Sequence, residues 1–164
     1  MLEVRARNDQ RKKGLRLLDM QNLVVGEGLK MREILFRGKR LDNGEWTQGF
    51  YKASPTGNHY ITRVGPMGCA HPDKVDPATV GQYTGLKEQN SRKIFEGDIV
   101  DCWSEGVNAK GTVQQRNDGL WIIYPAWQKT IMWGLCPDQY CHTTVEVIGN
   151  IHDNPDLIER SESE

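Results

Sequence analysis

The sequence lacks long apolar segments and has few cysteines. No apolar run approaches the ~18 residues that a membrane-spanning helix needs, and no charged, apolar, small-residue succession near the start indicates a secretion signal. The four cysteines are too sparse for a disulfide scaffold, and a reducing compartment would keep them as thiols. We therefore expect a cytoplasmic protein without a membrane interaction and without a structural disulfide.

The familiar catalytic motifs are also missing. There is no phosphate-cradling glycine loop, nucleophile elbow or metalloprotease helix. Cys141 and His142 could be a nucleophile and its base, but neighbours on an extended chain point to opposite faces. His152 and Asp153 could be an acid-base pair, yet they stand where a capped terminal helix is expected to begin, which favours a structural role. We predict no enzyme, no catalytic residue and no cofactor.

Neither sign of charge is in large excess, since the formal net charge is −1. The first 30 residues hold seven of the 21 basic and four of the 22 acidic residues. The remainder therefore carries a balance of −4. A mildly acidic domain after residue 30 would be a poor general binder of phosphate.

The length of 164 residues favours a single domain. Residues 1–30 form a basic extension with one weak amphipathic helical pattern, which Gly14 interrupts. Two interpretations of this extension stay open: Met31 is the natural start of translation, or the extension is a disordered or helical basic arm. We place a β domain at residues 31–158 and an acidic tail at residues 159–164.

The chain is rich in glycine, with 17 residues, and in short alternating apolar runs that are typical of strands. Asn43-Gly44 and Asp118-Gly119 are signals for tight hairpin turns. The pattern predicts a mostly β fold, a small barrel-like or rolled antiparallel sheet with long loops and a short C-terminal helix. The expected strands cover residues 33–37, 46–51, 59–63, 79–84, 111–115, 120–124 and 143–148, and the helix covers residues 156–159.

Two segments are predicted as loops. Residues 65–77 contain three prolines and two glycines, which argues against regular structure over most of this length. Residues 124–140 have apolar side chains at positions 127, 131, 132 and 135, a spacing that would suit a short helix within a loop.

The stretch KIFEGDIVDCW, residues 93–103, could build a strand or a site. Gly97 can supply an unusual backbone angle, and Asp98 can accept backbone hydrogen bonds where a strand begins. A divalent cation at Glu96, Asp98 and Asp101 is the alternative, but Asp98 and Asp101 would face opposite ways on a strand. We therefore interpret the stretch as the start of a strand.

Potential metal ligands occur in two loops. Their spacing lacks the two-residue gap of a zinc knuckle or ribbon, so ordinary thiols are favoured and no metal site is predicted. The residues that leave the zinc question open are Cys69, His71, Cys136, Cys141 and His142.

Aromatic residues are concentrated in the second half of the chain. They could form a stacking surface for single-stranded nucleic acid, but packing in the core is favoured because aromatics dominate the interior of small β domains. No basic stripe surrounds them. The residues concerned are Trp103, Trp121, Tyr124, Trp127 and Trp133.

Three segments in order, MREILFRG, QYTGLKEQNSRKIFEGDIV and VEVIGNIHDNPDL, closely resemble the YopX family of phage and prophage proteins over residues 31–158. The sequence departs from the family at Gln89-Asn90-Ser91, where Asn-Gly turn chemistry is expected, and in its four cysteines. The resemblance implies a mostly β fold, a phage or mobile-element origin and hence a bacterial host cell. It brings no activity and no catalytic residue.

These observations leave two functional hypotheses ahead of a third. The first is a non-enzymatic binding module that engages a host or phage protein through a sheet edge or a loop surface, with homo-oligomers allowed. The second is a nucleic-acid-binding small β-barrel that uses exposed aromatics and the basic residues 5–16; its binding should weaken steeply with salt. A metal-dependent enzyme ranks third.

Overall fold

The computed structural model describes residues 33–104, 107–127, 131–137 and 143–159. All of them belong to one compact unit, Glu33–Glu164. The predictions for the basic extension and for the tail from residue 160 lie outside the described residues.

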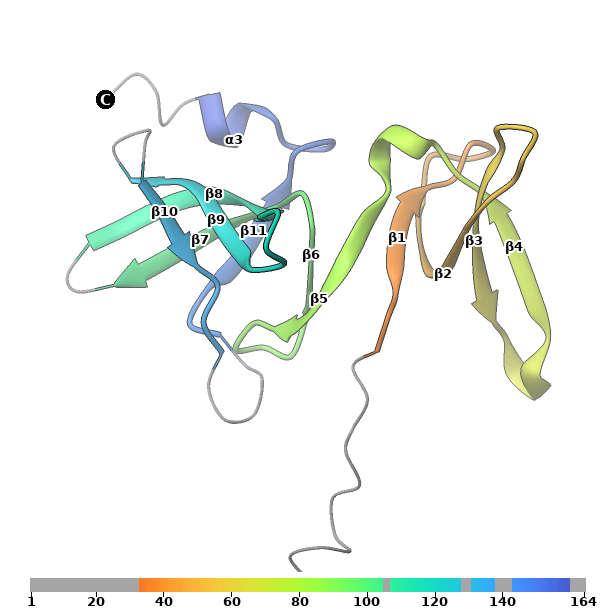
Figure 1. Cartoon of the computed structure of the whole chain (residues 1–164), viewed down its shortest axis with the longest axis horizontal. Coiled ribbons are helices and arrows are strands. Elements are labelled where there is room, and N and C mark those ends of the chain that lie inside the picture. The colour runs from red at the N-terminus through yellow and green to blue at the C-terminus, as the bar shows by residue number, and fades with distance from the viewer. Residues whose placement is uncertain (1–32, 105–106, 128–130, 138–142, 160–164) are drawn as a thin grey trace, which may run out of the picture. The chain divides into compact units, whose positions relative to one another are not determined.

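The first sheet has six antiparallel strands in the order β4-β3-β2-β1-β5-β6 (Figure 1). Its centre is the β1–β2 hairpin, in which Phe36 faces Gly49 and Lys39 faces Trp46. The strands are β1 (Phe36–Lys39), β2 (Trp46–Ala53), β3 (His59–Val64), β4 (Ala70–Lys74), β5 (Gly81–Lys87) and β6 (Lys93–Phe95).

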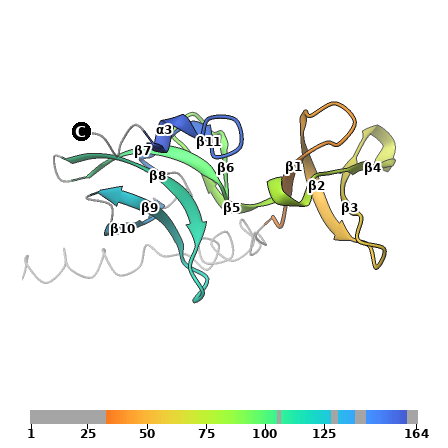
Figure 2. The ribbon, with the colours of Figure 1, turned by 90° about the horizontal axis from the view of Figure 1, so that it is seen from above.

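The second sheet has five antiparallel strands in the order β10-β9-β8-β7-β11, seen from a second direction in Figure 2. They are β7 (Asp98–Ser104), β8 (Val107–Gln115), β9 (Trp121–Trp127), β10 (Ile131–Gly134) and β11 (Glu146–Asn150). Short helices complete the described residues: η1 (Pro66–Gly68), η2 (Pro77–Thr79) and α3 (Asp156–Glu159). The mostly β class and the C-terminal helix are confirmed, and the described strands form two open sheets that do not close into a barrel.

Both predicted hairpins form, but the first has a different turn. Gly44 has a φ of +73°, whereas Asn43 keeps a negative φ and its side-chain oxygen accepts a hydrogen bond from the Glu45 amide at 3.0 Å. The connection is therefore longer than a two-residue turn. In the β8–β9 hairpin Gly119 takes a φ of +88°, as its position after an aspartate indicates. The first strand, predicted at residues 33–37, lies at residues 36–39.

The prediction of a loop over residues 65–77 is wrong in its second half, because β4 occupies residues 70–74. Pro72 faces Thr62 on β3, and β4 lies at the edge of the sheet. An edge strand tolerates proline because the missing N–H is not needed by a further strand. The prolines therefore mark a sheet edge here.

The prediction for residues 124–140 is also wrong, because β9 continues to Trp127 and β10 follows at residues 131–134. Trp127 and Ile131 are partners across the two antiparallel strands. An apolar spacing of four residues thus joins the two sides of a hairpin, although it equally matches one face of a helix. Residues 128–130 and 138–140 lie outside the described part.

The stretch from Lys93 to Trp103 starts a strand, as predicted. Gly97 has a φ of +79°, and Oδ2 of Asp98 accepts a hydrogen bond from the Phe95 amide at 2.8 Å. β7 then runs from Asp98 with Ile99 and Val100 fully buried. In the preceding turn Ser91 adopts a φ of +64°, so serine takes the backbone conformation that the expected glycine would have supplied.

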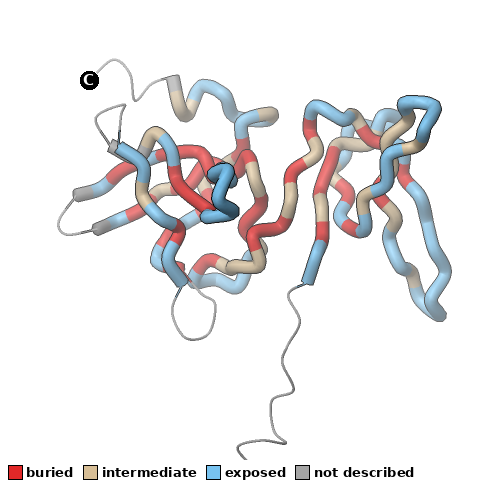
Figure 3. Tube along the Cα trace, in the orientation of Figure 1, coloured by how far each residue is buried: buried red, intermediate tan, exposed pale blue. Residues whose placement is uncertain are grey.

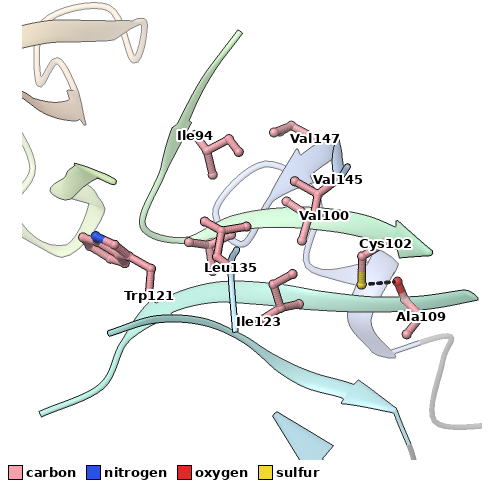
Figure 4. Packing of buried hydrophobic residues seen from close by; sticks show 10 residues of the cluster. Ile94, Val100, Cys102, Ala109, Trp121, Ile123, Leu135, Val145 and Val147 are labelled. Carbon is pink, nitrogen blue, oxygen red and sulfur yellow. Dashed lines mark hydrogen bonds between the residues drawn. The ribbon is translucent and has the colours of Figure 1, made fainter. Parts of the chain in front are cut away.

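The largest buried cluster is formed mainly by the second sheet, with Val100, Val113 and Ile123, and also includes Ile94 of β6 from the first sheet. Figure 4 shows most of its members. Figure 3 shows buried residues concentrated along β5 to β8, whereas the hairpin of β3 and β4 is mostly exposed. The core therefore supports the second sheet and its junction with β5 and β6, and leaves much of β2 to β4 at the surface.

Candidate binding groove

A groove of about 330 Å³ opens beside β1, β2 and β6 and the turn that follows β11. Three basic side chains, two amides, two aromatic rings and one carboxylate line it. The lining residues are Arg37, Trp46, Gln48, Arg92, Lys93, Phe95, Asn150 and Asp153.

Arg37 forms a fixed part of the groove. Its guanidinium carbon lies 4.8 Å from the centre of the Trp46 ring and 5.1 Å from that of Phe95. Nη1 lies 2.5 Å from Oδ1 of Asp98, and Nη2 donates to the Glu96 carbonyl at 3.2 Å. With only 7% of the residue exposed, its position is determined by four neighbours.

Asp98 supplies the counterion. Burial raises the pKa of its carboxyl group, and the nearby Arg37 charge and the Phe95 amide act in the opposite direction. The same carboxylate therefore begins β7 and neutralises Arg37. Asp98 was predicted only to start a strand, and no local sequence pattern indicates its second role as the counterion of Arg37.

Asp153 forms one wall and has three donors. Lys39 Nζ lies 2.5 Å from Oδ1, while Trp46 Nε1 and Asn150 Nδ2 each donate to Oδ2 at 2.7 Å. The Asn150 hydrogen bond is the main reason that the pKa of Asp153 is lowered to about 2, and Lys39 adds to it. The carboxylate is therefore ionised and well satisfied.

The backbone after β11 holds this wall in place. Oδ1 of Asn150 accepts hydrogen bonds from the amides of His152 and Asp153, both at 3.0 Å. The His152 ring lies 5.9 Å from the Trp46 ring, and burial followed by the charges of Arg37 and Lys39 lowers the pKa of the imidazole. His152 and Asp153 thus shape a turn beside Trp46, and the structural role predicted for them agrees with these contacts.

Two cationic residues at consecutive positions of the chain, Arg92 and Lys93, line the groove. Lys93 Nζ lies 2.9 Å from a carboxylate oxygen of Glu33, whose side chain is 56% exposed. Arg92 donates from Nη1 to the Val147 carbonyl at 3.2 Å. Within the described residues no carboxylate lies within ion-pairing distance of Arg92. Its charge is therefore available to a ligand.

The outward face of β2 extends the groove surface. Side chains alternate along a strand, so Trp46, Gln48 and Phe50 share one face. Gln48 and Phe50 are exposed, Phe50 by 57%. The face continues onto β3 and β4 through the register partners Phe50, Thr62 and Pro72.

The potential zinc ligands are not brought together in the described part of the chain. Cys69 and Cys136 are exposed thiols, and no group of three or more potential ligands is found among the described residues. Cys141 and His142, which were also considered as a nucleophile and its base, lie outside the described residues. For Cys141 and His142, the absence of a zinc site therefore stays a prediction.

The predicted aromatic cluster divides between the interior and the surface. Trp121 is buried in the core, Trp133 packs against it, and Trp103 is 63% exposed. Tyr124 is 37% exposed, and the side chain of Trp127 lies outside the described part. The core interpretation thus holds for Trp121, and the exposed Trp103 belongs to a different strand from the groove.

No motif in the sequence identified five of the groove residues, which are Arg37, Trp46, Gln48, Arg92 and Lys93. A partial signal was present, because Arg37 falls within an apolar run that was predicted as a strand. A charged residue at a buried strand position needs a partner from elsewhere in the fold. That partner is 61 positions away in the chain, and local periodicity cannot identify it.

The groove offers charged and amide donors within a rigid frame, which suits the binding of an anion or of a polar chain. Its lining contains no hydroxyl, thiol or imidazole nucleophile. No helix among the described residues is long and apolar enough to cross a membrane.

Three comparisons with known proteins were made, and one of them identifies a family. A family model described as "YopX protein" matches residues 35–159. The search of curated proteins finds no match. Among solved structures, the chain is similar to protein EF1440 from Enterococcus faecalis, with 18% sequence identity and a TM-score of 0.41 over 77% of this chain and 98% of that one.

Proposed function

The chain belongs to the YopX protein family. We propose that it is a phage- or prophage-encoded, non-enzymatic binding module for a host or phage protein. The observation that carries the proposal is the outward face of β2, β3 and β4. Phe50 on β2 is 57% exposed and Val64 on β3 is 62% exposed. Apolar side chains that share an exposed sheet face gain free energy when a partner removes them from water.

The arrangement of the strands favours docking on this face over pairing at a sheet edge. Pro72 interrupts the donors of the edge strand β4. On β11, the Val147 amide donates to a Glu88 oxygen at 2.7 Å and the Val147 carbonyl accepts from Arg92. Side chains thus occupy positions where an added strand would bind.

A specific observation favours nucleic acid as the second candidate. Tyr60 lies between Lys52 and Lys74 in the register of β2, β3 and β4, on the same outward face. An aromatic ring flanked by two cations could contact a base and its phosphates. Protein binding ranks first because the exposed apolar side chains of Phe50 and Val64 lie on the same face, and a protein partner can bury them.

Recovery of partners with matched variants tests the proposal. The tagged full chain, Phe50→Ser and Leu120→Ser are expressed in host cells under prophage induction, and co-purifying protein and nucleic acid are quantified with and without nuclease. Leu120 is the control because it is 45% exposed in the other sheet's β8–β9 turn. We expect one partner protein to co-purify with the parent and with Leu120→Ser, also after nuclease treatment, and not with Phe50→Ser. Calorimetry with the purified partner should give similar affinities for the parent and Leu120→Ser and a much lower affinity for Phe50→Ser. Equal recovery with all three, or nucleic acid alone, would contradict the proposal.

A further inference from the structure

We propose that the groove receives an acidic peptide segment of the partner protein, with carboxylate side chains at Arg92 and Lys93 and an apolar side chain at Phe50. This inference rests on the proposed function and specifies the chemistry of the partner. It is drawn from the charges, the ring contacts and the strand geometry of the groove.

The charges of the groove favour an anion. The positive charge of Arg37 is offset by Asp98 at 2.5 Å, and the negative charge of Asp153 is offset by Lys39. Arg92 has no carboxylate partner among the described residues, and Lys93 has one that is exposed. An exposed ion pair is worth roughly 0–1 kcal/mol, so a ligand carboxylate can replace Glu33 at little cost. Two adjacent cations are then available to it.

The ring contacts favour a peptide over a nucleotide. Arg37 and Lys39 lie over the Trp46 ring at 4.8 and 5.6 Å, and His152 lies 5.9 Å from it. Phe95 is only 2% exposed. Neither groove aromatic therefore offers a free face of the kind that base stacking requires.

The amide groups and the strand spacing suit an extended chain. Gln48 is exposed, and its side-chain amide has no hydrogen-bond partner among the described residues, so this amide can pair with a peptide N–H and C=O. Phe50 is two residues along on the same face, at a separation of roughly 7 Å. Alternate side chains of an extended peptide have the same separation. Because Arg92 and Lys93 line the same groove as Gln48, an acidic peptide residue that is held by the Gln48 amide places the residue two positions further along, on the same face, near Phe50.

The test uses the full, isotope-labelled chain and a capped six-residue peptide, Ser-Glu-Glu-Ser-Phe-Ser. Its second glutamate and its phenylalanine are two positions apart, so they share one face of the extended peptide. Binding is followed by NMR amide shifts. The expected shifts occur at Gln48, Phe50, Arg92 and Lys93. A version with glutamine in place of glutamate should bind about tenfold more weakly, which corresponds to about 1.4 kcal/mol. Salt should reduce the affinity of the glutamate peptide and leave that of the glutamine peptide nearly unchanged.

Single substitutions test whether the cations of Arg92 and Lys93 bind the carboxylates of the peptide. Lys93→Gln and Arg92→Gln should each weaken binding of the glutamate peptide by roughly three- to tenfold, as expected for desolvated charge pairs. Lys110→Gln is the matched control, because Lys110 is an exposed cation of β8 outside the groove lining. Since Arg92 also binds the Val147 carbonyl, Lys93→Gln gives a readout that is independent of that contact, and thermal unfolding of each variant checks that it remains folded.

Three binding results would overturn the inference: equal binding of the glutamine peptide, amide shifts confined to other residues, or an unchanged affinity in Lys93→Gln. The absence of binding up to about 1 mM would also overturn it, because an interaction of about −4 kcal/mol is half saturated at that concentration. So would tighter binding at the same residues by inorganic phosphate or by a thymidine oligonucleotide. A partner that is lost with Phe50→Ser but retained by Lys93→Gln and Arg92→Gln would preserve the proposed function and disprove the acidic segment. A failure to recover any partner protein would instead count against the proposed function.

Discussion

Arg37 on β1 and Asp98 at the start of β7 form a buried ion pair, with Nη1 and Oδ1 2.5 Å apart and 9% and 1% of the two side chains exposed. The pair joins the central strand of the first sheet to the first strand of the second. Asp98 also receives the Phe95 amide, so the same carboxylate fixes the chain direction between β6 and β7.

Replacing Asp98 with asparagine should strongly destabilise the protein. The change leaves the Arg37 guanidinium buried without a counterion, and breaking a buried pair from one side costs about 3–5 kcal/mol. Urea unfolding followed by fluorescence gives the free energy. Asp118→Asn is the control, because Asp118 pairs with Arg116 at the surface, and this change should have a much smaller effect. Similar losses in the two variants would show that the buried pair has no special importance.

Glu88 should be required for the stability of β11. Its carboxylate is buried and accepts the Val147 amide at 2.7 Å, so Glu88→Ala leaves a buried donor unpaired at a cost of roughly 1–3 kcal/mol. Hydrogen exchange at the Val147 amide should become faster than in the parent. Glu146→Ala, an exposed change on the same strand, should leave that exchange rate unaltered. Unchanged protection in Glu88→Ala would contradict the role of this contact.

The family motif illustrates what the sequence can predict. Gly97 and Asp98 were interpreted from local turn chemistry, and their backbone angle and hydrogen bond agree with it. Glu88 and Arg92 belong to the same motif, but their role depends on Val147, which is more than 50 positions away. Local rules thus identify turns and strand starts, whereas the closing of a strand edge by side chains depends on tertiary structure.

The two wrongly predicted loops and the unpredicted groove have a similar physical origin. Pro72 was taken to exclude a strand, but proline excludes only strands that need its donor, and sheet position is not visible in the sequence. The apolar spacing of Trp127 and Ile131 matches both a helical face and a hairpin. The groove was missed because Arg37, Trp46 and Arg92 come from three separate segments.

Cys102 should resist alkylation while Cys69 and Cys136 react. Cys102 is 5% exposed, its thiol donates to the Ala109 carbonyl at 3.1 Å (Figure 4), and burial raises its pKa to about 11. Alkylation of Cys102 is therefore slow for two reasons: the reagent cannot reach the buried thiol, and little of the thiol is present as the reactive thiolate. Iodoacetamide treatment of the native chain, with rates resolved by peptide mass spectrometry, measures the difference, and the same treatment in denaturant is the control. Comparable native rates at Cys102 and Cys69 would refute it.

Asp153 should make stability depend on pH in the acid range. Its pKa is lowered to about 2 from the usual 3.8, so the folded state binds a proton more weakly than the unfolded chain. The resulting stabilisation is fully present above the unfolded pKa and is lost as the pH falls through the folded pKa. Because the side chain is 36% exposed, solvent screening reduces its value to about 1 kcal/mol.

Urea unfolding of the parent and of Asp153→Asn should therefore differ by about 1 kcal/mol at neutral pH, and the difference should shrink below about pH 4 and disappear near pH 2. Lys39→Met removes one of the donors that lower the pKa, so it should move this transition to higher pH. A difference between parent and Asp153→Asn that stays near zero from neutral to acid pH would mean that the carboxylate charge does not stabilise the turn beside the groove. The contribution would then come from the hydrogen bonds of Trp46 and Asn150, which an asparagine at this position can also accept.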